Sequence, residues 1–554
     1  MLVLMTQRQG TGLTRTPFGT VKRCSRLPWS DTVRDYCHRT TLHGLKYVGD
    51  ENLHITERLF WLVMFLLAVA AAAYYISFLY EKWDLNPVIV SLSAKATSLN
   101  EFPFPAVTIC NMNRAKRSIA QKLMDYGSGN TEDPNYSLEY RLLRDLCALD
   151  SDGRYDEDNQ TSKWDAVQNF LVKVGQPCHE MLVGCSYAGQ SYDCTQLFNP
   201  TITDEGICCS FNKVHRDFLF RNPRDLSDLN VTFPIQTVDW TPESGYPANS
   251  VIGSVPFRPR GPGAHLGLRV VLDAQIDEYF CSSTASIGYK LLLHSPVETP
   301  KIAQTGNFLT PGEEIRVSIR PSITNSTPQL RYIPKSKRQC VFSSEVYLKF
   351  YRTYTQRNCA LECEANYTLE ICKCVLSYMP KDARTPICGY KDENCANNAK
   401  RAMELSLIED GDNTASFLAD NPRPNCKCLP ACSEISYHGS QTFSKMSSPA
   451  SFYFPKDYIG NYSNETYFRK NMAVVHVFFR ESQFTSQLKG ELFGFIEFLS
   501  STGGLLGLFL GFSFLSAAEV FYYLTLRLWC TVSRAKGTSS GTHGSYNSQF
   551  PFTQ

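Results

Sequence analysis

The sequence lacks an excess of charge of either sign. Its 554 residues carry 55 Lys and Arg against 53 Asp and Glu, a net charge of +2, and no basic run is long enough to follow a nucleic-acid backbone. Nucleic acid is therefore not expected as a partner. The catalytic spacings G-x-S-x-G, H-E-x-x-H and the P-loop are also missing, which argues against an ectoenzyme.

Charged residues are nearly absent from two segments that are long enough to cross a membrane. Residues Leu59–Tyr80 contain none, and 22 residues at about 1.5 Å each cover the ~30 Å hydrocarbon core. The charged residues in Phe493–Leu528 are only Glu497, Glu519 and Arg527. A core helix of a soluble protein with this length would need a polar face. We therefore expect two membrane spans.

The two spans divide the chain into five parts. We expect an N-terminal arm (1–57), a first span (58–80), a large middle region (81–490), a second span with its lead-in (491–528) and a tail (529–554). The N-terminus does not have the pattern of a secretory signal, so the first span is expected to act as its own signal and anchor. Basic residues before the first span and after the second favour cytosolic termini.

Cysteine is concentrated in the middle region. Of 21 cysteines, all but Cys24, Cys37 and Cys530 lie between Cys110 and Cys432. The remaining even number in one compartment predicts an oxidised extracellular domain. A zinc cluster is the weaker alternative because the C-x2-C spacing of metal knuckles is missing among the closely spaced cysteines after residue 340. The same region holds the N-x-S/T glycosylation sequons, at Asn135, Asn159, Asn230, Asn325, Asn366, Asn461 and Asn464.

The middle region combines strand and helix patterns, so an α+β fold is expected. Alternating apolar residues predict strands at Leu266–Leu272, Gly288–Leu293, Glu314–Ile319 and Met472–Phe479. Between Cys340 and Cys432 the pattern turns helical, over residues 344–367 and 399–410, and ten cysteines lie close together. We expect a separate disulfide-stapled subdomain there. Ten cysteines allow hundreds of pairings, so the spacing leaves the connectivity open.

Four motifs resemble the degenerin/epithelial sodium channel family. They are His43-Gly44 before the first span, FPAVTICN at 104–111, the cysteine series with CALEC and CKCVLSYMP, and GGLLGLFLGFSFLSAAEVFYY in the second span. The stretch RQCVFSSEVYLKFYRTYTQRNC is most similar to the insect pickpocket branch. The resemblance implies a homo- or heterotrimer in the bilayer of the plasma membrane, with a palm, ball, knuckle, finger and thumb. The thumb would be residues 340–432.

The function that this resemblance implies is a stimulus-gated, amiloride-sensitive, sodium-selective cation channel, with sodium as the permeant ion and no cofactor. The alternative is a non-conducting partner subunit or receptor that assembles with related subunits. Force, peptides, acid, osmolarity and contact chemicals all stay open as the stimulus. The family's disulfide pairing implies Cys340–Cys432, Cys359–Cys428, Cys363–Cys426, Cys372–Cys395 and Cys374–Cys388, with Cys110 joined to Cys208 or Cys209.

The triplet Gly511-Phe512-Ser513 stands at the filter position of the family. Small residues let backbone carbonyls approach a narrow pore axis and replace the water of a passing ion. By spacing alone, Gly503, Gly507 and Gly511 indicate close helix packing instead. The resemblance favours the filter role for Gly511 and Ser513.

Four further residues are candidates for conduction or gating. Glu519 is an ionisable residue inside a span, at a cost of about 2–3 kcal/mol or more, and three copies would form a cation-attracting ring. Snorkelling or a hydrogen bond between subunits is the alternative. Ser500 falls at the family's degenerin position, where bulk holds the pore open and amiloride-type blockers act nearby. His43 and Gly44 would influence gating or line the inner pore.

Overall fold

The computed structural model divides into two compact units. The membrane unit consists of Met1–Pro87 with Leu492–Gln554, and the α+β body is Val88–Glu491. The structure describes residues 29–127, 134–147, 163–231, 234–405, 426–446, 464–527 and 529.

The first span is one long helix, α3 (Ile55–Leu85). A capping box closes its N-terminus: the His54 ring accepts the Thr56 N–H, and the Glu57 carboxylate accepts the His54 N–H at 3.1 Å. The 31 residues of α3 span about 46 Å, more than the ~30 Å hydrocarbon core. The helix therefore extends beyond the uncharged run at both ends. Two short helices precede it, α1 (Trp29–Arg39) and α2 (Leu45–Gly49).

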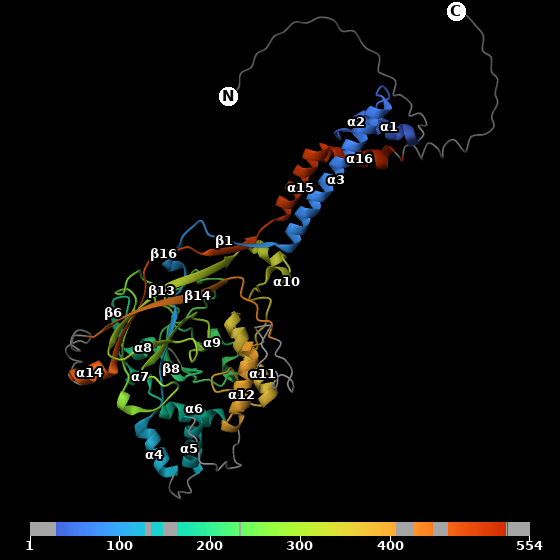
Figure 1. The fold of residues 1–554 in the computed structure, drawn as a ribbon. Coiled ribbons are helices and arrows are strands. Elements are labelled where there is room, and N and C mark those ends of the chain that lie inside the picture. The colour runs from blue at the N-terminus through green and yellow to red at the C-terminus, as the bar shows by residue number, and fades with distance from the viewer. Residues whose placement is uncertain are drawn as a thin grey trace, which may run out of the picture. The chain divides into compact units, whose positions relative to one another are not determined.

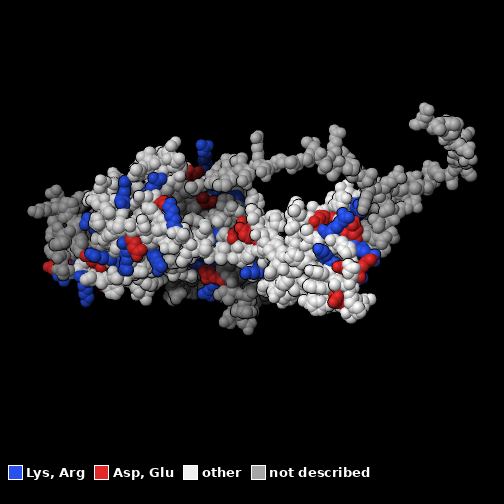
Figure 2. Space-filling view, turned by 90° about the horizontal axis from the view of Figure 1, so that it is seen from above, with Lys and Arg blue, Asp and Glu red and all other residues white. Residues whose placement is uncertain are grey.

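The second span lies beside α3 and is broken in two. Helix α15 (Phe495–Leu510) contacts α3 through Tyr75 on Phe509 and Trp83 on Phe498, with ring centroids 5.8 and 5.5 Å apart (Figure 1). The following segment, α16 (Phe514–Tyr522) with a π-helical turn (Tyr523–Arg527), departs at 72°. Both α3 and the bent pair are long and apolar enough to cross a membrane. On the face in Figure 2, the charges of the membrane unit gather at the end that carries α1 and α16.

The α+β body contains an eight-stranded sheet built around β13 (Glu313–Ser326). Strand β13 pairs antiparallel with β14 (Glu434–Lys445) and parallel with β15 (Met472–Phe479) and β17 (Gln487–Glu491). The order is β1-β17-β13-β15-β9-β5-β6, with β14 added on β13. The other strands are β1 (Val88–Leu92), β5 (Leu182–Tyr187), β6 (Gln190–Tyr192) and β9 (Leu268–Asp273).

A five-stranded sheet, β12-β11-β3-β8-β7, holds the FPAVTICN stretch as β3 (Ala106–Asn111). All four predicted strands are confirmed, as β9, β11 (Tyr289–His294), β13 and β15. Strand β11 is buried along its whole length, so its two polar residues Lys290 and His294 need partners inside the body. The remaining strands are β7 (Phe198–Thr203), β8 (Gly206–Phe211), β12 (Asn307–Leu309), and the short pairs β2 (Thr97–Ser98) with β16 (Gln483–Phe484) and β4 (Asn113–Lys116) with β10 (Tyr279–Ser282).

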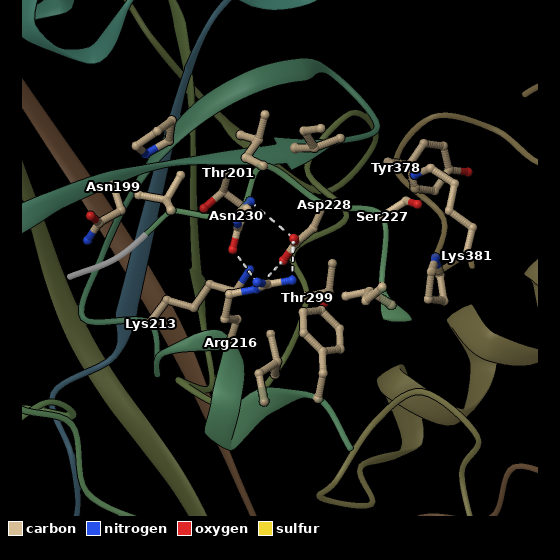
Figure 3. Close-up of a pocket in the computed structure, with 18 of the residues that line it drawn as sticks. Asn199, Thr201, Lys213, Arg216, Ser227, Asp228, Asn230, Thr299, Tyr378 and Lys381 are labelled. Atoms are coloured by element: carbon tan, nitrogen blue, oxygen red, sulfur yellow. Dashed lines mark hydrogen bonds and ion pairs between the residues drawn. The ribbon is translucent and has the colours of Figure 1, made fainter. Parts of the chain in front are cut away.

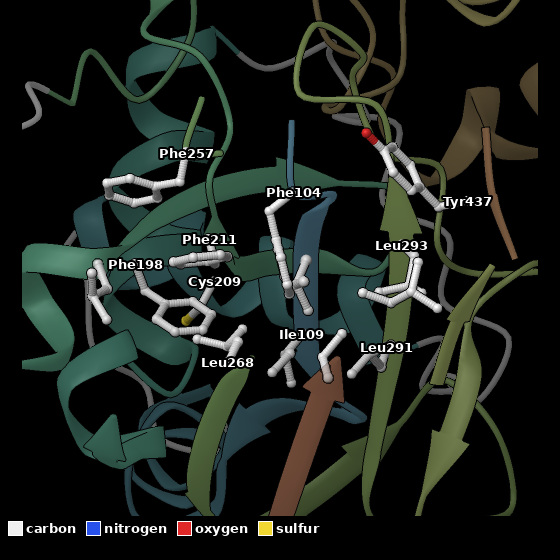
Figure 4. Close-up of a cluster of buried hydrophobic side chains, with 14 of the residues drawn as sticks. Phe104, Ile109, Phe198, Cys209, Phe211, Phe257, Leu268, Leu291, Leu293 and Tyr437 are labelled. Atoms are coloured by element: carbon white, nitrogen blue, oxygen red, sulfur yellow. The ribbon is translucent and has the colours of Figure 1, made fainter. Parts of the chain in front are cut away.

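One hydrophobic core joins the two sheets. Leu268 of β9 and Leu291 of β11 belong to the same buried cluster, with an aromatic group above them (Figure 4). In that group the Phe211 ring stacks on Phe257 and meets Phe104 edge-on, with centroids 5.6 and 5.9 Å apart. Offset and edge-on arrangements are the favourable geometries for aromatic pairs.

The helical pattern between Cys340 and Cys432 is only partly correct. Helix α11 (Gln356–Cys372) begins at Gln356, so the predicted helix over 344–355 is wrong. In that stretch the Lys349 and Phe350 N–H groups donate to the Glu362 carboxylate, which satisfies the backbone without a helix. Helix α12 (Tyr390–Leu405) covers the start of the second predicted segment, and residues 406–410 lie outside the described residues. The other helices are α4 (Arg117–Gly127), α5 (Pro134–Cys147), α6 (Trp164–Val174), α7 (Cys178–Met181), α8 (Cys194–Leu197), α9 (Arg216–Leu219), α10 (Lys335–Arg338) and α14 (Glu465–Asn471).

Disulfides pair every cysteine of the α+β body. The five bonds after residue 339 are the same five that the resemblance implies, and Cys110 joins Cys208. The pairs that neither spacing nor resemblance assigned are Cys147–Cys281, Cys178–Cys209 and Cys185–Cys194. Each bond restricts the unfolded chain, and the longest loops gain the most in the chain-entropy account.

Candidate functional site

The second span breaks at Gly511-Phe512-Ser513. Gly511 ends α15 in the left-handed conformation, with φ of +64°, and its N–H donates to the Gly507 carbonyl at 3.0 Å. Residues with a Cβ lose roughly 1–2 kcal/mol in this conformation, whereas glycine adopts it freely. The chain can therefore end one helix and start another within three residues.

Ser513 starts the second half of the span. Its hydroxyl accepts the Ser516 N–H at 3.2 Å, and the Ser516 hydroxyl accepts the Ser513 N–H at 3.1 Å. This reciprocal capping box satisfies two of the N–H groups that have no acceptor within the helix at its start. Ser513 is itself exposed, so its hydroxyl oxygen is accessible at the break.

The break also frees backbone oxygens. Within the described chain, we find no hydrogen bond to the carbonyls of Phe509, Gly511 or Phe512. In a continuous helix the N–H groups of Ser513 and Ser516 would serve Phe509 and Phe512, but the capping box uses both. The Phe512 N–H donates to Leu506 and the Ser513 N–H to Ser516. Unbonded backbone at membrane depth is tolerated only where it is covered by protein or lines a wet cavity. The break therefore presents oxygen ligands inside an apolar span.

The segment before α2 packs against this break. The His43 N–H donates to the Leu510 carbonyl at 3.0 Å, and the His43 ring covers Gly511 so closely that a Cβ there would lie 2.6 Å from the ring. Gly44 follows with φ of +84°, which turns the chain into α2. The structure thus brings His43 and Gly511 together, although 468 positions separate them in the chain.

Glu519 is bound by the same segment. Its carboxylate accepts the Thr41 N–H at 3.1 Å and the Thr41 hydroxyl at 3.2 Å, and that hydroxyl also contacts the buried Ser516 hydroxyl at 2.6 Å. These bonds lower the cost of a carboxylate in the span. Sequence reasoning missed Thr41 and Ser516; the S-x-x-S spacing after the glycine was the one available signal for the cap.

The remaining candidates in the second span, Ser500, Gly503 and Gly507, lie on α15 before the break. Ser500 is exposed on α15. A Cβ on Gly503 would meet no atom within 4 Å, and one on Gly507 only the Phe512 oxygen at 3.9 Å. These two glycines therefore do not serve packing inside the membrane unit of one chain.

The sequons that the structure describes lie on the surface. Asn230, Asn325, Asn366 and Asn464 are exposed. Asn135 is on α5, without a described side chain, and Asn159 and Asn461 lie outside the described residues, as do Cys24 and Cys530.

Residues 36–523 match the family described as amiloride-sensitive sodium channel. The chain belongs to the amiloride-sensitive sodium channel family. It is 38% identical to Pickpocket protein 28 of Drosophila melanogaster, over 92% of this chain and 80% of that protein. It is 26% identical to the sodium channel protein Nach of the same fly, over 91% of this chain and 88% of that one, and 26% identical to Acid-sensing ion channel 1A of Danio rerio, over 88% and 87%.

Membership in the amiloride-sensitive sodium channel family makes the chain a membrane protein with two spans and no enzymatic role. The spans flank a disulfide-rich α+β domain, as the broken second helix and the nine disulfides of the structure show. Its relatives are named as sodium channels and acid-sensing ion channels.

Proposed function

We propose that this chain is one of three subunits around the pore of a stimulus-gated, sodium-selective channel of the plasma membrane, and that Gly511, Phe512 and Ser513 form its filter. The observation that carries the proposal is the set of unbonded carbonyls at the break of the second span, next to the exposed Ser513 hydroxyl. An ion that leaves water needs such oxygens as replacement ligands.

The other candidates take roles around this filter. Three Glu519 carboxylates would attract cations near the inner mouth, and the segment with His43 and Gly44 would support the filter from below. Ser500 would be the gate-sensitive position on α15. Cytosolic termini are supported by the flanking basic residues, and an extracellular α+β body by its paired cysteines.

The filter is tested by comparing two glycines of one helix. In oocytes, a Ser500→Phe background is expected to hold the pore open, so that current is measured without knowledge of the stimulus. In this background Gly511→Ala should lower the sodium-to-potassium permeability ratio by about tenfold. A Cβ is strained in the left-handed conformation and displaces His43, so the carbonyls of the break shift; a tenfold change in the ratio corresponds to about 1.4 kcal/mol in the relative binding of the two ions.

Gly503→Ala is the matched control, since no atom lies within 4 Å of its Cβ. It should keep the parent ratio, and surface biotinylation should show equal amounts of both variants. Reversal potentials that are unchanged in Gly511→Ala would contradict the filter assignment. Surface expression without any amiloride-sensitive current, regained only with a related subunit, would instead favour the non-conducting partner.

A further inference from the structure

The α+β body contains a cavity that none of the pore residues lines. It has a volume of about 90 Å³ and lies between β7, the segment 213–231 and the turn at 377–381 (Figure 3). Since about 10–15 Å³ suffices for one water molecule, the cavity can hold a small molecule of several non-hydrogen atoms.

The charges that line this cavity do not balance. Three cations, Lys213, Arg216 and Lys381, face one carboxylate, Asp228. Both oxygens of Asp228 are used by Arg216, whose guanidinium lies 3.1 Å from one and 2.8 Å from the other. The same guanidinium donates to Asn230 and to the Pro223 carbonyl. Arg216 and Asp228 thus neutralise each other, and two ammonium groups remain.

Neither ammonium group has a carboxylate in contact. Lys381 is 3% exposed; its Nζ donates to the carbonyls of Ser377 at 2.6 Å and Met379 at 3.2 Å, and it lies 3.9 Å from the centre of the Trp164 ring. For Lys213, no hydrogen bond from Nζ is found among the residues that the structure describes. Burial lowers the pKa of Lys213 to about 8 and that of Lys381 to about 7, and in both Asp228 offsets only part of the effect.

The other titratable groups that line the cavity are neutral, and the carboxylates behind them, Asp204, Glu362 and Glu364, contact other groups than the two lysines. Burial lowers the pKa of His294, which lies near Lys213, to about 3, so this ring is neutral at pH 7. Burial raises the pKa of the lining phenols Tyr351 and Tyr378, which are neutral as well. Glu364 behind Tyr378 is paired with Lys301 at 2.8 Å.

Part of the wall is apolar. Leu219, Phe220 and Tyr351 line the cavity, and Met379 and Pro380 precede the lysine on the turn. A halide would use only the cationic groups. A small carboxylate would use both parts, with its charged end at a lysine and a short carbon chain against the aromatic rings.

We propose that this cavity binds a small carboxylate, attracted by the positive charge of Lys213 and Lys381. Uptake of the anion supplies the negative charge that the two lysines lack. Because Asp228 competes for the same cations, removal of its charge should strengthen binding rather than weaken it.

Thermal melting of the purified full chain in nanodiscs tests the proposal, with sodium acetate or propionate replacing sodium gluconate at constant ionic strength. The melting temperature should rise with acetate until it saturates, because a ligand of the folded state stabilises it by mass action. Lys381→Met and Lys213→Met should weaken the apparent affinity at least tenfold, and Asp228→Asn should tighten it. Lys373→Met is the control: this lysine is exposed, and among the described residues its Nζ donates to the Glu370 carbonyl alone.

A saturable shift that is lost in both cavity variants and enhanced in Asp228→Asn supports the site. An equal shift in wild type, Lys381→Met and Lys213→Met overturns it, as does an unchanged affinity in Asp228→Asn. Stabilisation by chloride but not by acetate or propionate overturns the carboxylate assignment. Since melting does not depend on conduction, a negative result here leaves the proposed filter untouched.

Discussion

At the residue scale, Glu519 shows how a carboxylate is retained in an apolar segment. Two donors from Thr41 stabilise it, and the side chain remains partly exposed. Exposed charges act most strongly at low ionic strength, where screening is weak.

Glu519→Gln is therefore expected to lower single-channel conductance, by severalfold at about 10 mM sodium and much less at about 150 mM, where the Debye length is about 8 Å. Recordings at both concentrations in the Ser500→Phe background measure this. The comparison variant is Glu57→Gln at the start of α3, where glutamine still completes the capping box. Equal conductance losses at both concentrations would argue against an electrostatic role for Glu519.

A second residue-scale case is the buried ion pair in β11. Lys290 contacts the Glu205 carboxylate at 2.8 Å, with side chains 3% and 1% exposed, and also donates to the Ala303 carbonyl at 2.9 Å. Lys290→Met leaves Glu205 without its cation, and breaking a buried pair in this way costs about 3–5 kcal/mol.

The purified full chain should melt at a clearly lower temperature when it carries Lys290→Met. Lys173→Met breaks the pair with Glu139, where the side chains are 48% and 25% exposed, and should cost less than about 1 kcal/mol. The double variant Lys290→Met with Glu205→Leu should regain part of the loss, because it leaves no unpaired charge. Similar melting temperatures for Lys290→Met and Lys173→Met would show that the buried pair contributes no more to stability than the exposed pair.

At the element scale, the N-cap residue of α14, Asn464, is also a glycosylation sequon. The Asn464 side chain accepts the N–H groups of Thr466 and Tyr467 at 3.0 and 3.3 Å, which makes it the N-cap. A glycan attaches to the amide nitrogen, whereas the cap uses the amide oxygen, so both roles fit one side chain.

Substitutions at Asn464 separate these roles. Asn464→Asp should retain the cap and lose any glycan, seen as a shift in gel mobility without a change in melting temperature. Asn464→Ala should lose both and cost about 1 kcal/mol. If Asp and Ala destabilise the chain equally, the cap does not contribute.

The start of α11 shows where a local sequence pattern fails to predict a helix boundary. The helix predicted from 344 begins at 356, because Thr355 supplies the N-cap by accepting the Asn358 N–H. Residues before it bond to Glu362 on the next element instead. Such a long-range acceptor leaves no periodic signal in the segment that uses it. The predicted strands, in contrast, depend on alternation along one segment, and all four are present.

At the scale of the whole molecule, the buried Lys381 links stability to pH. The folded-state pKa of Lys381, about 7, lies below its ordinary value of 10.5, so the unfolded chain binds more protons between these values. Stability is therefore expected to rise from pH 7 to 9, and to be lower below pH 7, where the lysine is charged in both states. Melting temperatures of the full chain in gluconate, without small anions, should show this rise.

Lys381→Met should flatten that rise, and Lys373→Met should leave it unchanged. Acetate should flatten it too, since a bound anion stabilises the charged lysine. A wild-type chain whose melting temperature falls between pH 7 and 9 would contradict the assignment, because buried tyrosines such as Tyr354, with its pKa raised to about 12, act only above this range.

The sequence by itself determined the two spans, the oxidised middle region and the main strands, because each depends on composition or periodicity within one segment. Family motifs added the proposed filter triplet and the disulfide partners of the region 340–432. Only the tertiary structure decided that His43 covers Gly511, that Thr41 binds Glu519, and that Lys213 and Lys381 share one cavity. These contacts join positions far apart in the chain, so their geometry depends on the packing of whole elements rather than on any local pattern.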